Sequence, residues 1–526
     1  MKMIKERKKS CLRIKKIVNK VEEYYVFVPI MCYVLCGLAP VVAAIKYTPL
    51  YSYQKYLGII GILIILVDII VNKTIYREKY SLLLYALLFI ASVSSVMTIN
   101  YGFKKNIFNL AWTLIMFFIF YQFSLKCGME RFKNICHKLY YIIAVIWLMA
   151  IIFSIISFLY NVGYGLITNP YTPEALTRQG FSENRLFGVF MSINVAAITS
   201  GVLLLISIYM LGKEKKLYAK GFCIINMFFD IIYIILSGSR SAYYGLLFIG
   251  MIYVIYAIYS YLKPKKSVIV KWSLSLFGSV VSVICIMIAV SVAKNVLETV
   301  PKFSIFENKK IVYEQFIGKL PYTEMPEKES LNEEEIDGEI DGEIAVESES
   351  LHRKDISAEN ISNNRFQIWG DYLRLYRKIG LVGLSPCNYS KVIAENYPDI
   401  YIVKYIKDFH PDLYEEGTIY HPHSLYLEIY VATGIIGVLC FLGFWILCLK
   451  DVIVYLKYYK GKIPPVIVMG MLIVIYGLFT SIFDQGLFFL TNIVSCIFWI
   501  VLGYVMTTIT EKRGLVRKTK KFQEVK

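Results

Sequence analysis

Long apolar runs separated by short polar segments dominate the pattern of this chain. A helix needs roughly 17 to 25 apolar residues to cross the hydrocarbon core of a bilayer. Runs of this length predict about 12 transmembrane helices, near residues 24–45, 55–72, 80–98, 106–125, 139–159, 190–211, 220–236, 241–262, 270–293, 424–449, 464–482 and 486–509. The pattern therefore predicts an all-α polytopic membrane protein, and we expect the first run to be a retained helix rather than a signal peptide.

Lysine and arginine are distributed unevenly between the loops. Short loops rich in these residues remain on the cytoplasmic side of a membrane. The N-terminus, the loops 73–79, 126–138, 213–220, 263–271 and 450–462, and the tail from Lys512 are basic, whereas the alternate short loops are poor in lysine and arginine. We therefore expect both termini in the cytoplasm and the alternate loops on the extracytoplasmic side of the cell membrane.

The amino-acid composition also indicates a polytopic membrane protein. Of the 526 residues, 57% are hydrophobic and only 18% are charged. The net charge of +18 comes from clusters between apolar runs, so it indicates topology rather than a nucleic-acid partner. Most of the 11 cysteines fall inside apolar runs, which favours packing over a disulfide framework.

The predicted helices divide the chain into five segments. These are a cytoplasmic basic N-terminus (1–23), spans 1–9 (24–293), a large extracytoplasmic loop (294–423), spans 10–12 (424–509) and a cytoplasmic basic tail (510–526).

The large loop contains an acidic run and, after it, a helical pattern. The acidic run predicts a disordered segment near 324–360, because like charges with few aromatic residues cannot bury enough surface. A calcium loop is an alternative, but the spacing lacks the EF-hand pattern. From Arg365 to Lys378, we expect an amphipathic helix with Phe366, Trp369, Leu373 and Tyr376 recurring at helical spacing.

Arginines stand at the expected outer boundary in two earlier segments. Arg185 precedes Asn194 at the start of one span, and Arg240 lies in the short turn 237–241. Such an arginine often only anchors a helix at the interface. Arg240, however, is the only basic residue in a short loop on the side poor in lysine and arginine. Its fixed fork of donors suits phosphate.

Two histidines, His421 and His423, stand where the large loop becomes an apolar helix, followed by Tyr426 and Glu428. Imidazole titrates near neutral pH, which suits it to accept a proton from a hydroxyl. Capping of the next helix is an alternative role for His423. Zinc is a third, but His-x-His alone is a weak metal pattern. We expect no metal and no cofactor. The sequence has no phosphate loop or nucleotide-sugar domain, which favours a lipid-linked donor.

The order of these motifs resembles the bacterial O-antigen ligase and O-antigen polymerase (Wzy-like) superfamily, over residues from about 180 to 440. Two positions depart from the family pattern: Ser424 stands where asparagine is usual, and Leu384-Ser385-Pro386 replaces a more glycine-rich turn. The resemblance rests on Arg185-Leu186-Phe187-Gly188 with Asn194, Ser239-Arg240-Ser241, Arg365-x-x-x-Trp369, the segment Gly380 to Leu384, the segment His421 to Glu428, and Gly434 to Gly437.

The resemblance implies a metal-independent, membrane-embedded glycosyltransferase of the GT-C-like type. Its substrates would be an undecaprenyl pyrophosphate-linked oligosaccharide donor and a glycan acceptor at the outer leaflet. Arg185 and Arg240 would hold the pyrophosphate and His423 would activate the attacking hydroxyl. The expected substrate-binding residues are Arg365, His421, Tyr426, Glu428 and Asn194, with Glu428 as an orienter of His423.

Among enzymes with this chemistry, we expect a polymerase that builds a capsular polysaccharide, an exopolysaccharide or an O-antigen-like polymer. Other polysaccharide assembly proteins are its expected partners. A ligase that moves finished glycan to another acceptor is the alternative. An alternative of another class is a transporter or flippase of lipid-linked sugars, which Asp68 and Asp230 keep open. Transporters usually show repeated halves and charge near the midplane, and here no repeat is evident.

Overall fold

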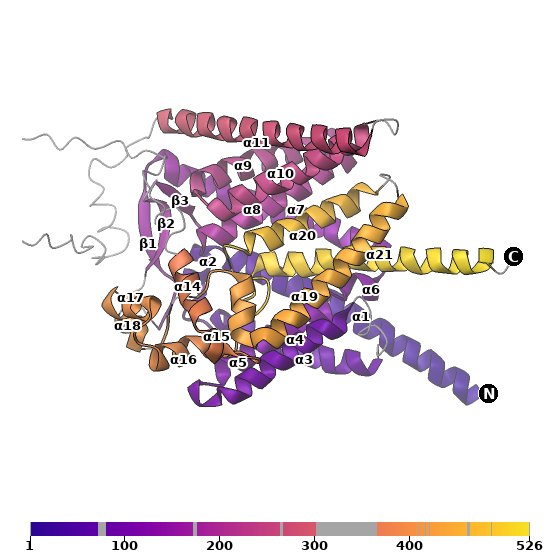
Figure 1. The fold of residues 1–526 in the computed structure, drawn as a ribbon, viewed down its shortest axis with the longest axis horizontal. Helices are drawn as coiled ribbons and strands as arrows, with labels where there is room; N and C mark the ends of the chain where they lie inside the picture. Colours follow the sequence, from indigo (N-terminus) through magenta and orange to yellow (C-terminus); the bar gives the residue numbers. More distant parts are fainter. Residues whose placement is uncertain are drawn as a thin grey trace, which may run out of the picture.

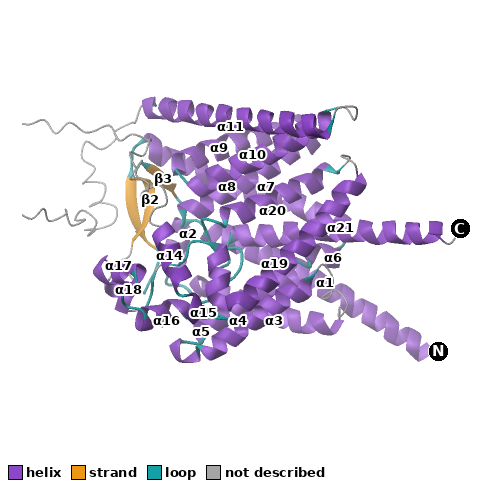
Figure 2. Cartoon of the chain, in the orientation of Figure 1, coloured by secondary structure: helices purple, strands orange, loops and turns teal. Residues whose placement is uncertain are grey.

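The protein is described by a computed structural model in which a bundle of helices carries a small sheet and a group of short helices at one end (Figures 1 and 2). The termini lie toward the opposite end. The expected acidic segment near 324–360 lies outside the described residues. These are 2–71, 80–171, 176–182, 184–262, 267–300, 365–409, 411–415, 417–419, 421–459, 463–484 and 486–524.

Each of the predicted apolar ranges overlaps at least one helix, and the ranges 24–45 and 106–125 each cover more than one element. Among the described residues, nine apolar helices are long enough to cross a membrane, while α4 and α20 are shorter. The all-α polytopic class is thus confirmed, and the number of spans stays a prediction. The main helices in the predicted ranges are α1 (Lys2–Cys36), α3 (Tyr53–Val71), α4 (Ser81–Met97), α5 (Lys104–Ile115), α7 (Met129–Leu159), α8 (Ile193–Lys213), α9 (Leu217–Ser237), α10 (Arg240–Tyr261), α11 (Val268–Thr299), α19 (Leu425–Tyr459), α20 (Pro465–Thr480) and α21 (Ile493–Glu524).

The first predicted span is interrupted. After α1, the short helix α2 (Ala39–Ile45) begins beyond a break at Gly37 and Leu38. Ala39 N–H donates to the Val189 carbonyl (2.8 Å), and Gly37 O accepts from Met191 N–H (2.9 Å). The segment before α8 therefore satisfies the backbone groups that the break releases, which a break within a membrane helix requires.

The connection before α8 contains a three-stranded antiparallel sheet that the sequence analysis did not predict. Its strands are β1 (Gly163–Ile167), β2 (Leu176–Ser182) and β3 (Arg185–Gly188), in the order β1-β2-β3. The sheet is anchored to α7 by Phe181, whose ring contacts that of Phe158 at a centroid distance of 5.0 Å. Burial along β2 does not alternate, so the period-2 signal of a strand is missing from it.

The described part of the large loop forms short helices with an apolar core of their own. They are α14 (Arg365–Arg374), α15 (Tyr376–Ile379), α16 (Tyr389–Asn396), α17 (Tyr401–Phe409) and α18 (Pro411–Glu415). The expected helix from 365 to 378 is therefore two helices. Its expected apolar face was wrong as well: Phe366 and Leu373 are 61% and 54% exposed, whereas Ile368 and Tyr372 are buried.

Helix α19 breaks at Gly434, which has φ +62°. A Cβ atom on Gly434 would lie 2.4 Å from the Leu381 carbonyl carbon, and one on Gly383 would lie 2.4 Å from that of Ala432. The segments 380–385 and 431–436, which contain the two glycine motifs, therefore pack closely and pair through backbone hydrogen bonds. These hydrogen bonds run from Ile435 N–H to Gly380 O (3.3 Å), Ile436 N–H to Leu381 O (3.1 Å), Leu384 N–H to Val431 O (2.8 Å) and Ser385 N–H to Ala432 O (3.1 Å).

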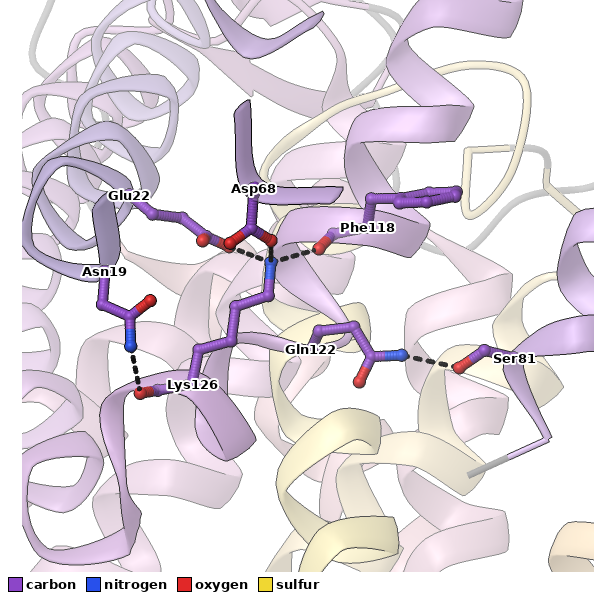
Figure 3. Close-up of polar contacts among 7 residues, drawn as sticks. All are labelled: Asn19, Glu22, Asp68, Ser81, Phe118, Gln122 and Lys126. Atoms are coloured by element: carbon purple, nitrogen blue, oxygen red, sulfur yellow. Dashed lines mark hydrogen bonds and ion pairs between the residues drawn. The ribbon is translucent and has the colours of Figure 1, made fainter. Parts of the chain in front are cut away.

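A buried ion network joins α1, α3 and α6 (Phe123–Cys127) near the end of the bundle where the termini lie (Figure 3). Lys126 Nζ lies 2.7 Å from Glu22 Oε1 and 2.6 Å from Asp68 Oδ2, and all three side chains are at most 2% exposed. Lys126 Nζ also donates to the Phe118 carbonyl (2.8 Å), within the π-helical turn Met116–Phe120.

Asp68 therefore pairs with a lysine inside the bundle. Asp230, the other aspartate that kept the transporter alternative open, accepts a hydrogen bond from Asn226 Nδ2 (2.7 Å) and is buried. The ion pair with Lys126 explains the burial of Asp68, whereas Asp230 Oδ1 has no hydrogen-bond partner among the described residues.

Candidate functional site

Arg185 and Arg240 meet at the turn between α9 and α10. Arg185 begins β3, and its Nε–H donates to the Ser237 carbonyl at 2.9 Å. Gly238 ends α9 in the left-handed conformation (φ +61°), and a Cβ atom there would lie 3.5 Å from Arg185 Nε. Arg240 is the first residue of α10. The Arg185 guanidinium thus lies along the turn that leads directly into Arg240.

Asn194 contacts the same turn from α8. Its Oδ1 accepts from the Ser239 hydroxyl at 3.3 Å, and Ser239 Oγ lies 3.3 Å from Ser241 Oγ. The start of α8, the end of α9 and the start of α10 are thereby held together. The N-terminus of a helix carries partial positive charge and exposed N–H groups, so the start of α10 adds to the attraction of Arg240 for an anion.

The positive charge of Arg240 acts on Arg365. Burial lowers the pKa of the Arg365 guanidinium; the Asp484 carboxylate opposes this shift, and the positive charge of Arg240 adds to it. The structure therefore brings the first residue of α14 near the first residue of α10 and near the loop between α20 and α21.

Asp484 was missed by the sequence analysis. A signal was present, because Asp484 is the only Asp, Glu, Lys or Arg between Pro465 and Thr510, and it stands between the last two apolar runs. An ionisable residue in that setting is a candidate for function. Its neighbour in space, Arg365, is far away in the sequence, so the pairing itself had no local signal.

His423 occupies a left-handed backbone conformation (φ +46°), which residues other than glycine rarely adopt. The turn is held from α14, where Trp369 Nε1–H donates to the Pro422 carbonyl at 2.8 Å. It is held from α20 as well, through Leu425 N–H and the Ser481 carbonyl (2.9 Å). A conformation of this kind persists only where the surroundings impose it, and such positions cluster at functional sites.

The environment of His423 keeps its imidazole neutral. Burial lowers the pKa of His423 to about 4, and the positive charges of Arg365 and His421 contribute to the shift. A neutral imidazole can accept a hydrogen bond or a proton from a hydroxyl group. His423 and Arg365 are thus close enough for one charge to influence the other.

His421 is engaged with the short helices of the loop. Its Nδ1 is hydrogen-bonded to the Tyr389 hydroxyl, and the two rings are edge to face with centroids 5.8 Å apart. Burial lowers the pKa of His421, and the positive charge of Lys105 contributes. His421 is therefore held against α16, whereas the charge of Arg365 acts on His423.

Tyr426 and Glu428 lie in α19 beyond the histidines. The Tyr426 hydroxyl donates to the Leu478 carbonyl at 2.9 Å, so it ties α19 to α20. Glu428 is 1% exposed, and its Oε2 has no hydrogen-bond partner among the described residues. Burial raises the pKa of Cys387 to about 12, and the Glu428 carboxylate contributes. Since no described hydrogen bond joins Glu428 to His423, its role as an orienter of His423 stays a prediction.

The two departures from the family pattern keep the local geometry. Ser424 directly precedes α19, and its carbonyl accepts from Glu428 N–H (2.9 Å). Serine and asparagine are both favoured immediately before a helix. Ser385 has φ +74°, a conformation that favours glycine, and its Oγ accepts from Asn388 N–H at 3.0 Å. A side-chain hydrogen bond therefore supports the turn where the family usually has glycine.

The described residues contain no group of three or more His, Cys, Asp and Glu side chains arranged to hold a metal ion. The expected residues that do come together are Arg185, Arg240 and Asn194 around one turn, and Arg365 and His423 beside it, with Asp484 added. They gather at the end of the bundle that carries the sheet and the short helices (Figure 1).

Comparison with known protein families matches residues 225–442 to the family described as O-antigen ligase. This segment contains Arg240, Arg365 and His423, while Arg185 precedes it. Comparisons with curated proteins and with solved structures gave no match. The apolar helices and the matched domain together suggest an integral inner-membrane protein, and the matched family implies lipid-linked glycan substrates. The match over residues 225–442 supports the resemblance of this chain to the O-antigen ligase and polymerase superfamily, whose members are membrane enzymes of the glycosyltransferase type.

Proposed function

We propose that this protein is a polysaccharide polymerase. It transfers glycan from an undecaprenyl pyrophosphate-linked donor to a sugar hydroxyl of a lipid-linked acceptor at the outer leaflet, without a metal ion. The observation that carries the proposal is the group of arginines beside a neutral histidine, in which Arg240 and Arg365 influence each other and Arg365 lowers the pKa of His423.

Arg185 and Arg240 would bind the donor pyrophosphate. Arg185 contacts the turn between α9 and α10 from β3, Arg240 follows that turn as the first residue of α10, and the N–H groups at the start of α10 add further donors. Negative charge develops on the pyrophosphate as the bond to the sugar breaks. Guanidinium groups held in place before the reaction stabilise that charge without reorganising, which lowers the barrier.

His423 would receive the attacking hydroxyl of the acceptor. In the absence of donor, burial and the charge of Arg365 make it a weak base with a pKa of about 4. A bound pyrophosphate brings negative charge to the arginines, and nearby negative charge favours the protonated imidazole. Donor binding therefore raises the basicity of His423 at the moment when a hydroxyl must be activated, so the donor binds first in this scheme.

Asp484 would position Arg365 through their opposite charges. Arg365 stands at the start of the described part of α14, where Trp369 also fixes the turn before His423. Helix α14 would thereby link the phosphate-binding and hydroxyl-binding parts of the site.

A ligase that moves finished glycan to a different acceptor is the second candidate, favoured by the matched family description. It would use the same donor and the same residues. The acceptor alone distinguishes it from a polymerase.

The test is gel analysis of glycan from cells that produce His423→Ala, Arg240→Ala or Arg185→Ala, each checked for expression in the membrane. Arg374→Ala is a matched control, since this side chain of α14 is 82% exposed. Loss of polymer with accumulated single lipid-linked repeats supports a polymerase. Free lipid-linked polymer of normal length supports a ligase. Full-length polymer from the well-expressed variants would contradict the assignment.

Orientation needs its own test. A topology reporter fused after Glu349 should register outside the cytoplasm if both termini are inside. A cytoplasmic signal from this fusion would invert the proposed arrangement.

A further inference from the structure

Two apolar cavities lie at the end of the bundle opposite the candidate site. The larger, of about 740 Å³, lies between α8, α10 and α20, and the smaller, of about 160 Å³, between α7, α8, α20 and α21. Helix α8 begins beside the site at Ile193 and reaches Lys213 after 21 residues, a distance of about 30 Å. Tyr209, Lys213, Val466 and Met469 line both cavities, so α8 and α20 separate them.

Missing side chains create part of the larger cavity. Gly212 and Gly250 line it, and a Cβ atom added to either would meet no atom within 4 Å. The rest of the wall is mainly aliphatic, with Leu204, Leu246 and Leu472 among its residues. A volume of 740 Å³ falls within the range of roughly 300 to 1,000 Å³ that is usual for ligand pockets. Apolar walls offer few hydrogen bonds to water, so the space suits a hydrocarbon chain.

The mouth of both cavities is basic. Lys213 is the last residue of α8, and its Nζ lies 5.8 Å from the centre of the Tyr209 ring. No carboxylate among the described residues lies within 4.0 Å of Lys213 Nζ, whereas Glu214 is bonded to His137 Nε2 at 2.8 Å. The exposed Lys215 follows two residues later, beyond the end of α8. The phosphate of a lipid would therefore meet a lysine that has no ion pair within 4.0 Å among the described residues, although the charges of Glu130 and Glu214 act on it from farther away.

We propose that this is a binding site for an anionic glycerophospholipid. The phosphate binds at Lys213, one acyl chain occupies the larger cavity, and the second enters the smaller one. Two apolar spaces that meet at one cation match an amphiphile with two chains and a negative headgroup. A polyprenyl carrier has a single chain and would leave one space empty. Basic pockets between membrane helices commonly bind anionic headgroups.

A lipid at this position would support the candidate site from the other end of the same helices. Helices α8 and α10 carry Asn194 and Arg240 at their first turns, and they border the larger cavity with the second half of α8 and the middle of α10. A ligand that binds only the folded protein stabilises it by mass action. The inference depends on the cavities and the lysine, and not on the proposed reaction.

The test uses the purified full-length protein in detergent and measures lipid binding by native mass spectrometry. Phosphatidylglycerol and phosphatidylcholine with identical acyl chains are compared. We expect tighter binding of phosphatidylglycerol, and about fivefold weaker binding of it in Lys213→Ala, with phosphatidylcholine binding unchanged. Lys55→Ala removes an exposed lysine at the start of α3, at the other end of the bundle, and should change neither.

The cavity itself is tested by filling it. Gly250→Leu should weaken binding of both lipids, and Gly212→Leu serves as a second variant if the first unfolds. Gly221→Leu is the matched control, since a Cβ atom at Gly221 in α9 also meets no atom within 4 Å and this residue lines neither cavity. Equal affinity for the two lipids, unchanged binding in both Lys213→Ala and the cavity variants, or displacement of phosphatidylglycerol by an equal concentration of polyprenyl phosphate would each overturn the proposal.

Discussion

His423 combines a left-handed backbone, a hydrogen-bonded turn on either side and a charged neighbour. Each feature comes from a different element, since α14 supplies Trp369 and Arg365, and α20 is followed by Ser481. The sequence predicted the position of this histidine at the boundary. Its neutral state could not be predicted, because burial and the charge of Arg365 depend on the approach of a distant helix.

The lowered pKa of His423 predicts a pH dependence. The quantity to measure is kcat/KM for lipid-linked repeat units in proteoliposomes, which reports the enzyme before it binds the donor. We expect kcat/KM to fall only as the pH drops toward about 4. The folded protein holds this histidine neutral, so the unfolded chain binds the proton more readily between about pH 6.5 and 4. Stability from this group is therefore present above that window and is lost as pH falls through it.

The variant Arg365→Gln tests whether the charge of Arg365 contributes to the pH profile of kcat/KM. Removal of one positive charge should raise the pKa of His423 and move the acidic limb to higher pH. An acidic limb at the ordinary histidine value in both proteins would contradict the role of Arg365.

A second prediction concerns the side chain of Asp484 and its effect on the rate. Asp484→Asn removes the negative charge beside Arg365, so Arg365 should lose its position and the rate should fall by up to about 100-fold. The rate of polymer formation by membranes with matched protein levels measures this, and Asp484→Glu should restore much of it. Asp399→Asn is the control, since the Asp399 side chain is 93% exposed. A rate unchanged in Asp484→Asn would remove Asp484 from the site.

The break in α19 shows how two elements become one structural unit. Both glycine motifs were visible in the sequence, but their pairing was not, because backbone hydrogen bonds between 380–385 and 431–436 leave no trace in residue type except glycine itself. The helical face of α14 presents a similar case. Phe366 and Leu373, like Ile368 and Tyr372, recur at helical spacing, and only contact with the neighbouring helices determined which pair is buried.

Gly434→Ala tests the pairing of these elements. The new Cβ atom would lie 2.4 Å from the Leu381 carbonyl carbon, and φ +62° is itself unfavourable for alanine. We expect a loss of at least about 1 to 3 kcal/mol in the free energy of unfolding, measured by thermal unfolding in detergent. Gly221→Ala in α9 should be neutral or stabilising, because it meets no atom and alanine favours helix. Equal stability of the two variants would show that the backbone at Gly434 yields without cost.

At the scale of the whole molecule, the ion network and the candidate site lie toward opposite ends of the bundle. Lys126 carries the only positive charge shown in the network, between Glu22 and Asp68 (Figure 3). Burial of ions is costly unless each is paired, so the network makes the packing of α1, α3 and α6 dependent on Lys126.

Lys126→Met should therefore destabilise the protein by about 3 to 5 kcal/mol, because it leaves two carboxylates buried without a partner. Thermal unfolding and the amount of protein in the membrane measure the effect. Lys133→Met, which removes a surface pair with the exposed Glu130, should cost far less stability. A variant of Lys126 that is stable but inactive would contradict a purely structural role.

The sequence by itself determined the membrane class, the places of the long helices and most of the candidate residues. These follow from local properties, because a bilayer requires long apolar helices and leaves polar residues conspicuous at their ends. Tertiary structure alone decided the sheet that positions Arg185, the buried face of α14, and the grouping of Arg240, Arg365, His423 and Asp484. Each of these depends on contacts between residues far apart in the chain, and such contacts have no local period that a sequence pattern can reveal.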